Sequence, residues 1–233
     1  MSLKKSNGNM YPWVTHTHSH LGGECPHACT YCYVDNPRFG RPAKYTGPIR
    51  LLEDEFKVNY GTGRTIFVEN CNDLFAAAVP GEMIDRVLAH CRAFPGNTYV
   101  FQTKNPARVI DFYLRMPNNF LLGTTIETNR HYPDVMGNAP TPEARADAME
   151  RMSNDCMGPV KVFITIEPIL DFDLYQLLCW IAAIKPEFVN IGADSKGHGL
   201  VEPAGAKVRA LLNALTRCDV SIRAKHNLDR LLQ

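Results

Sequence analysis

The sequence predicts an α/β fold, a partial (β/α)6 TIM-like barrel with parallel strands and outer helices. Short runs rich in β-branched residues alternate with helical patterns along most of the 233 residues, which is the order of right-handed parallel crossovers. Several runs are apolar on both faces, as residues 160–166 are, and strands covered by helices read in this way. Polar residues gather where the runs end, as they do at the functional rim of such barrels. A doubly wound open sheet is the main alternative.

Seven runs have the length and composition of strands. They cover residues 13–18, 65–69, 98–103, 120–126, 160–166, 188–192 and, more weakly, 220–223. Six or seven strand–helix units in a chain of this length fit a barrel smaller than eight-fold.

Helical stripes follow most of these runs. The stripes are Met83, Ile84, Val87, Leu88 and Cys91; Leu174, Leu177, Leu178 and Ile181; and Val208, Leu211, Leu212 and Leu215. Asn105-Pro106 and Thr141-Pro142 each pair an N-cap residue with proline at the first helical position, which predicts two helix starts.

Composition excludes several classes of protein. The chain has 25 Lys and Arg against 24 Asp and Glu, so neither a strongly basic nucleic-acid coat nor an acidic tail is expected. No apolar run is long enough to span a membrane, and the N-terminus lacks an apolar signal core. We therefore expect one domain over residues 1–233, in the cytoplasm and with no membrane association.

Three of the eight cysteines cluster. Cys25, Cys29 and Cys32 form C-x3-C-x2-C in a glycine-led loop after the first predicted strand. Three such thiolates can bind one corner of an iron–sulfur cube, which usually takes four cysteines, so one iron would stay open for another ligand. The other cysteines are expected to be structural, because cysteine is commonly buried; they are Cys71, Cys91, Cys156, Cys179 and Cys218.

This loop resembles the radical S-adenosylmethionine (radical SAM) superfamily. The resemblance implies that Cys25, Cys29 and Cys32 hold a [4Fe-4S] cluster and that S-adenosylmethionine chelates the open iron. It implies reductive cleavage to a 5′-deoxyadenosyl radical that abstracts hydrogen from a substrate, with an electron donor such as flavodoxin or ferredoxin. Tyr31, the aromatic residue before the third cysteine, fits the family pattern and is expected near the adenine.

The resemblance also implies cofactor contacts at the strand ends. The family's Gly-Gly-Glu-type segment, which binds the amino group of the cofactor, is replaced here by residues 69–73. The candidate cofactor-binding residues are Tyr31, Glu69, Asn70, Asn72, Asp73, Gln102, Lys104, Thr125, Glu127, Glu167 and Asn190.

Other segments resemble small phage- and prophage-type radical-SAM-like proteins: Phe67-Val68 with Asp73-Leu74-Phe75, Gln102-Thr103-Lys104-Asn105-Pro106 and Thr165-Ile166-Glu167-Pro168. With the basic residues Arg38, Arg41 and Lys44 after the cysteine loop, this resemblance favours a nucleic acid or nucleotide as the substrate of a modification or repair reaction.

Two alternatives remain open. His16, His18 and His20 alternate along a predicted strand and share one face, so with His27 and the cysteines they are candidates for the zinc site of a non-catalytic binding module. The carboxylates Glu69, Asp73, Glu127 and Glu167 are alternatively structural, paired with Lys104, Arg64 or backbone amides.

Overall fold

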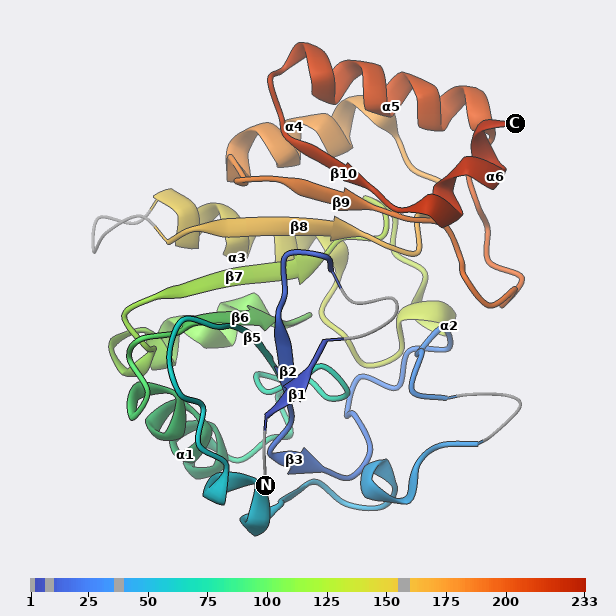
Figure 1. Ribbon diagram of the computed structural model, residues 1–233. Helices are drawn as coiled ribbons and strands as arrows, with labels where there is room; N and C mark the ends of the chain where they lie inside the picture. Colours follow the sequence, from blue (N-terminus) through green and yellow to red (C-terminus); the bar gives the residue numbers. More distant parts are fainter. Residues whose placement is uncertain (1–2, 7–10, 36–39, 155–159) are drawn as a thin grey trace. The chain divides into compact units, whose positions relative to one another are not determined.

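A computed structural model describes residues 3–6, 11–35, 40–154 and 160–233 (Figure 1). Its main sheet has the strand order β1-β2-β5-β6-β7-β8-β9-β10. The strands are β1 (Lys4–Lys5), β2 (His16–His18), β5 (Thr65–Val68), β6 (Thr98–Gln102), β7 (Phe120–Thr125), β8 (Val162–Ile166), β9 (Val189–Ile191) and β10 (Ile222–Ala224). All seven predicted strands are present.

The sheet is mostly parallel, as expected. The pairs β2–β5, β5–β6, β8–β9 and β9–β10 are parallel. The two-residue edge strand β1 was not predicted and pairs antiparallel with β2. A second small sheet, also not predicted, joins β3 (Leu21–Gly22) to β4 (Arg50–Leu51).

Helices occupy the predicted stripes. They are α1 (Gly81–Arg92), α3 (Pro142–Asn154), α4 (Leu174–Ile184) and α5 (Gly205–Arg217), with the short α2 (Pro133–Met136) and α6 (Asp229–Leu232). Among the residues that the structure describes, four segments are 3-10 helices: η1 (Ala43–Tyr45), η2 (Glu53–Lys57), η3 (Pro106–Arg115) and η4 (His226–Leu228).

Two local predictions need correction. The first strand begins at His16 rather than at residue 13, because the chain turns before it, with Val14 N donating to Tyr11 O at 2.9 Å. Pro106 does start a helix, but a 3-10 helix, and Asn105 does not cap it; the Asn105 amide donates instead to Phe75 O at 3.0 Å. Thr141 does cap α3, accepting from Ala144 N at 3.2 Å.

The chain divides into two compact units. The first comprises residues up to Ala28 and from Cys32 to Leu122, and the second comprises Cys29–Tyr31 and Gly123 onward. The first unit contains β1 to β6, α1 and η3; the second contains α2 to α6 and β8 to β10, and β7 supplies residues to both.

Each unit has its own buried core. In the first, Ile66 and Val100 of the strands are fully buried, as is Leu88 of α1. In the second, α4 and α5 lie side by side along β9 and β10 (Figure 1, orange to red), and they bury Leu177 and Leu211. Each such side chain stabilises the fold by about 1.5–3 kcal/mol.

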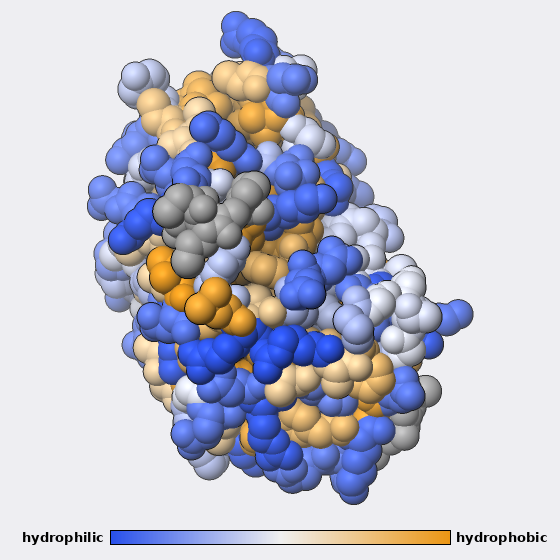
Figure 2. Space-filling view, turned by 90° about the vertical axis from the view of Figure 1, so that its left-hand side faces the viewer, coloured by the Kyte–Doolittle hydropathy of each residue, from blue (hydrophilic) through white to orange (hydrophobic). Residues whose placement is uncertain are grey.

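Hydrophilic and hydrophobic side chains are interspersed on the face shown in Figure 2. Within the described ranges, no helix has both the length and the apolar character that crossing a membrane requires.

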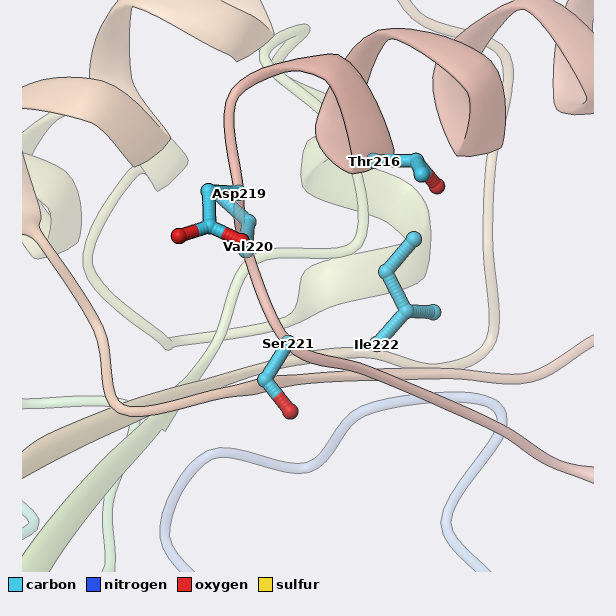
Figure 3. A pocket seen from close by; sticks show the side chains of 5 residues that line it. All are labelled: Thr216, Asp219, Val220, Ser221 and Ile222. Atoms are coloured by element: carbon cyan, nitrogen blue, oxygen red, sulfur yellow. The ribbon is translucent and has the colours of Figure 1, made fainter.

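A hollow of about 250 Å³ is lined by Thr216, Asp219, Val220, Ser221 and Ile222 (Figure 3). It lies where α5 ends and β10 begins. Sites of parallel α/β folds lie at the carboxyl ends of strands, so this hollow is not where the predicted chemistry belongs.

Candidate functional site

The cysteine loop leaves β3 through two glycines. Gly23 has φ +91°, and a Cβ built on it would lie 2.2 Å from Pro48 O, so only glycine fits here. Gly23 N donates to Lys44 O and Glu24 N to Gly47 O, both at 2.9 Å. Residues 44–48 therefore hold the backbone that leads into the loop.

Glu69, directly after β5, is bound to the residues that precede this loop. Its Oε1 accepts from His20 N at 2.6 Å and lies 2.9 Å from His20 Nδ1, and its Oε2 accepts from Leu21 N at 3.1 Å. The carboxylate is almost fully buried. In the structure Glu69 therefore contacts two backbone amides and the ring of His20.

Asp73 contacts the cysteine loop at a second point. Its Oδ2 lies 2.7 Å from His27 Nε2 and accepts from Lys104 N at 2.7 Å, while Oδ1 accepts from Phe75 N at 3.0 Å. Burial by itself would raise the pKa of Asp73, but the hydrogen bond and charge of His27, with the Lys104 amide, lower it below its ordinary value. Asp73 is therefore a buried, charged acceptor beside His27.

Asn72 lies between these contacts and has an unused acceptor. Its Nδ2 donates to Gly23 O at 3.0 Å. Its Oδ1 is buried and has no hydrogen-bond partner among the described residues. A buried acceptor without a donor is costly and uncommon, so this oxygen suits a donor from a bound molecule.

The neighbouring candidates also have protein partners. Asn70 Oδ1 accepts from Ser19 Oγ at 3.1 Å, and Asn70 O accepts from the Tyr33 hydroxyl, which lies 3.6 Å from Cys71 Sγ. Gln102 Oε1 accepts from the Tyr11 hydroxyl at 2.9 Å. The structure therefore brings Asn70, Asn72 and Asp73 to the loop, and Cys71 with them.

The middle of the cysteine loop belongs to the second unit. Cys29 is buried and its thiol donates to Met136 O at 3.3 Å. Thr30 N donates to Val135 O at 3.1 Å. Residues 29–30 are thus held by the backbone of α2.

Tyr31 is anchored by Glu127, which follows β7. The Tyr31 hydroxyl donates to Glu127 Oε1, and Arg145 Nη1 lies 2.8 Å from Glu127 Oε2. Burial, followed by the charge of Glu127, raises the pKa of Tyr31 well above its ordinary value, so the phenol stays protonated and donates. The network fixes the ring that the resemblance places near an adenine.

Arg145 is the residue of this network that sequence reasoning missed. Both side chains of the Arg145–Glu127 pair are fully buried, and Arg145 Nη1 also donates to Thr125 O at 2.5 Å. Arg145 lies among alanines and acids of α3, a pattern that reads as a solvated helix face, so no sequence signal distinguished it.

The remaining candidates lie at strand ends of the second unit. Glu167 follows β8 and forms an ion pair with Lys225 Nζ at 2.8 Å. Asn190 of β9 donates from Nδ2 to Thr165 Oγ1 at 3.2 Å. A Cβ on Gly192 would come within 2.9 Å of the Glu167 carboxylate, so the glycine leaves room for that group.

Two histidines of the zinc alternative, His18 and His20, lie in an aromatic cluster, whereas His16 lies beside Thr15 Oγ1 and His27 beside Asp73. The rings of His18 and His20 are 4.7 Å apart, and His20 Nε2 lies 2.9 Å from the Tyr60 hydroxyl. Burial, followed by the charge of His20, lowers the pKa of His18 to about 4. Across the described ranges, no three His, Cys, Asp or Glu side chains are grouped as ligands of one metal ion.

Two of the basic residues after the cysteine loop, Arg41 and Lys44, form ion pairs within the protein. Arg41 Nε lies 2.6 Å from Asp35 Oδ1, and Lys44 Nζ lies 2.9 Å from Glu55 Oε1. Arg38 and Cys156 lie outside the described residues. The described members of this basic group therefore already have acidic partners.

The three loop cysteines differ in burial. Cys25 and Cys32 are half-buried, Cys29 is buried, and none of the three is in a disulfide. Cysteine thiols outside any disulfide, on one short loop, are the donor set that an iron–sulfur cluster requires, so the chemistry of these residues fits the cluster that the resemblance implies.

Solved structures share this fold. A spore photoproduct lyase complexed with dinucleoside spore photoproduct matches with a TM-score of 0.65 and 11% identity, over 95% of this chain and 78% of its own. Streptococcus suis SuiB bound to the precursor peptide SuiA matches with a TM-score of 0.61 and 12% identity, over 94% of this chain. SuiB bound to S-adenosylmethionine matches with a TM-score of 0.59 and 13% identity, over 94% of this chain and 52% of its own.

The chain spans about half the length of the SuiB structure with the peptide, 50% of it. At these identities the likeness shows the fold alone, and it confirms the expected α/β fold of partial-barrel type with a mostly parallel sheet and flanking helices. No curated protein matches the sequence.

A family model matches residues 11–172, which include the cysteine loop and the strand ends from β2 to β8. The chain therefore belongs to the family described as "Protein of unknown function (DUF5131)".

Proposed function

We propose that this protein is a radical SAM enzyme in which Cys25, Cys29 and Cys32 hold a [4Fe-4S] cluster. One observation carries the proposal: three cysteines spaced C-x3-C-x2-C, none of them in a disulfide, follow the first parallel strand of a fold shared with radical SAM enzymes. A structure with the same fold is bound to S-adenosylmethionine, which supports that cofactor here. Plain structural cysteines would explain neither the spacing nor the loop's position.

When bound, the cluster and S-adenosylmethionine supply a 5′-deoxyadenosyl radical that takes a hydrogen atom from a substrate. The chain's own residues bind and orient. Tyr31 is fixed by Glu127 and Arg145, so its ring is held ready to pack on an adenine. Asn72 Oδ1 is a buried acceptor without a donor, which suits the cofactor's ammonium group.

Other strand-end residues complete the proposed cofactor set. Asn70, Gln102, Lys104, Thr125 and Glu167 follow or end strands of the main sheet, and Asn190 lies within β9, one residue before its end. The carboxyl ends of strands form the rim at which such folds bind ligands. Several of these residues have protein partners, so we propose that they shape the site and that Asn72 supplies a direct contact.

For the substrate we propose a nucleic acid or nucleotide. A spore photoproduct lyase structure of this fold holds a dinucleoside photoproduct, and the phage-type resemblance points to the same class. SuiB holds a peptide, so the test includes one. Oligonucleotides are expected to raise the rate of 5′-deoxyadenosine formation above that with peptides; stimulation by peptides alone contradicts the assignment.

The central experiment is anaerobic purification and reconstitution with iron and sulfide. We expect a brown protein with broad absorbance near about 400 nm and 5′-deoxyadenosine after reduction with S-adenosylmethionine. Cys29→Ala is expected to abolish both. Cys179→Ala, which removes an exposed free cysteine outside the loop, is the matched control and is expected to retain both.

Two results contradict the proposal. One is an absence of iron and sulfide after reconstitution of the wild-type chain. The other is a colourless protein with stoichiometric zinc that is lost in Cys29→Ala, which identifies the zinc-binding module instead.

A further inference from the structure

Residues 69–73, here called the clamp segment, contact the cysteine loop and its approach at three successive points. Glu69 binds the amides of His20 and Leu21, Asn72 donates to Gly23 O at 3.0 Å, and Asp73 lies 2.7 Å from His27 Nε2. These contacts fall on both sides of Cys25. The side chains of the clamp segment thereby fix the path of the backbone into and through the cysteine loop.

Glu69 has little capacity left for a ligand. Its carboxylate is almost fully buried and accepts from two backbone amides and from the His20 ring. Its backbone is in the left-handed region, with φ 59°, which a glutamate rarely adopts. The Glu69 amide donates to His18 O at 2.8 Å, so both backbone and side chain are committed to the same strand end.

The contact continues behind His20. When His20 Nδ1–H donates to Glu69, its Nε2 accepts from the Tyr60 hydroxyl, 2.9 Å away. Burial raises the pKa of Tyr60 far above its ordinary value, so this hydroxyl keeps its proton. Tyr60 and His20 are both fully buried. The chain of contacts Tyr60–His20–Glu69 has no exposed member, which is the arrangement of a rigid support.

We propose that Glu69 and Asp73 are positioning residues that hold the cysteine loop in the shape that accepts the cluster, and that Glu69 is not a ligand of S-adenosylmethionine. This rests on the proposed function, and it departs from the role that the radical SAM resemblance gives this segment. The observation behind it is that protein groups already make at least three polar contacts with each of these two carboxylates.

The test uses the full chain in two states. In the cluster-free state, alkylation rates are measured by mass spectrometry at Cys25 and Cys32, with the exposed Cys179 as internal reference. Glu69→Gln and Asp73→Asn are each expected to raise the rates at Cys25 and Cys32 by about tenfold, the change expected for losing a hydrogen bond to a charged group. Glu53→Gln, which removes an exposed carboxylate paired with Arg86, is expected to change neither rate.

In the reconstituted state, iron content and the electron paramagnetic resonance spectrum of the reduced cluster are measured while S-adenosylmethionine is added. Both clamp variants are expected to lose iron. In the variant molecules that keep a cluster, the concentration of S-adenosylmethionine that gives half of the spectral change is expected to equal the concentration measured for the wild type. That readout separates positioning from direct binding.

Full iron content with a tenfold or larger increase in that concentration in Glu69→Gln would make Glu69 a cofactor ligand and overturn the proposal. Unchanged alkylation rates in both variants would also overturn it. Should Glu69→Gln fail to fold by circular dichroism, Asp73→Asn decides the positioning role by alkylation rates and iron content, and Glu69→Asp takes the place of Glu69→Gln in the cofactor titration. A wild-type chain that never takes up iron refutes the proposed function, whereas the alkylation rates still test the clamp.

Discussion

Arg145 and Glu127 form an ion pair 2.8 Å long with both side chains fully withdrawn from water. Glu127 holds the Tyr31 hydroxyl with its other oxygen. Because two buried charges compensate each other here, removal of one leaves the other unpaired in a poorly polarisable interior. The pair therefore links the stability of the second unit to the placement of Tyr31.

Arg145→Met is expected to lower the free energy of unfolding by about 3–5 kcal/mol, since Glu127 then lies buried without its partner. Urea unfolding followed by circular dichroism measures this. Arg130→Met, which breaks a more exposed pair with Asp171 and Asp173, is the control and is expected to cost about 1 kcal/mol or less. Equal losses of unfolding free energy in Arg145→Met and Arg130→Met would show that the buried ion pair stabilises the fold no more than the exposed one.

Gly23→Ala is expected to distort the entrance to the cysteine loop. A Cβ there would lie 2.2 Å from Pro48 O, whereas Gly47, also at positive φ, has nothing within 4 Å. Gly47→Ala is expected to cost about 1 kcal/mol from backbone strain alone. Gly23→Ala adds a clash with backbone, so its loss of unfolding free energy is expected to exceed that of Gly47→Ala clearly, with lower iron uptake. Similar losses would contradict the close packing.

Acidification is expected to destabilise the first unit through His18. Its pKa is about 4 in the fold against 6.5 as the ordinary value, mainly because of burial. Between these values the unfolded chain takes up a proton that the folded chain refuses, so stability falls as pH falls from 6.5 towards 4. The shift corresponds to at most about 3 kcal/mol.

Unfolding free energies measured from pH 7 to 5 in wild type and His18→Gln check this. The variant has no ring to protonate, so its stability is expected to fall less over that range. Parallel curves for the two proteins would assign the acid sensitivity to other groups.

Asn72→Ala is expected to weaken the response to S-adenosylmethionine. The buried Oδ1 lacks a donor, and a ligand that binds only the folded state raises the melting temperature. With the cluster loaded, the cofactor is expected to raise the melting temperature of wild type more than that of Asn72→Ala. Asn119→Ala serves as the control, because Asn119 is far from the loop in sequence and its side chain donates a hydrogen bond to Thr98 Oγ1. An equal rise in both variants would remove Asn72 from the cofactor site.

Local pattern was sufficient for much of the fold. Apolar runs such as residues 160–166 and stripes such as that of α5 depend on neighbours along the chain, so their strands and helices could be predicted. The ends of two elements differ from the prediction. The turn at Val14 shortens β2, and the side-chain amide of Asn105 donates to Phe75 O instead of capping η3. Those choices depend on partners distant in sequence.

The sequence by itself determined the cysteine spacing, the position of that loop after the first strand and the polar strand ends, because all three are properties of order along the chain. Only the tertiary structure decided which polar groups already have partners: Glu69 with His20 and Leu21, Asp73 with His27, and Glu127 with Arg145. A hydrogen bond or an ion pair depends on distance in space, and residues about 20 to 50 positions apart meet only when the strands and helices between them have packed.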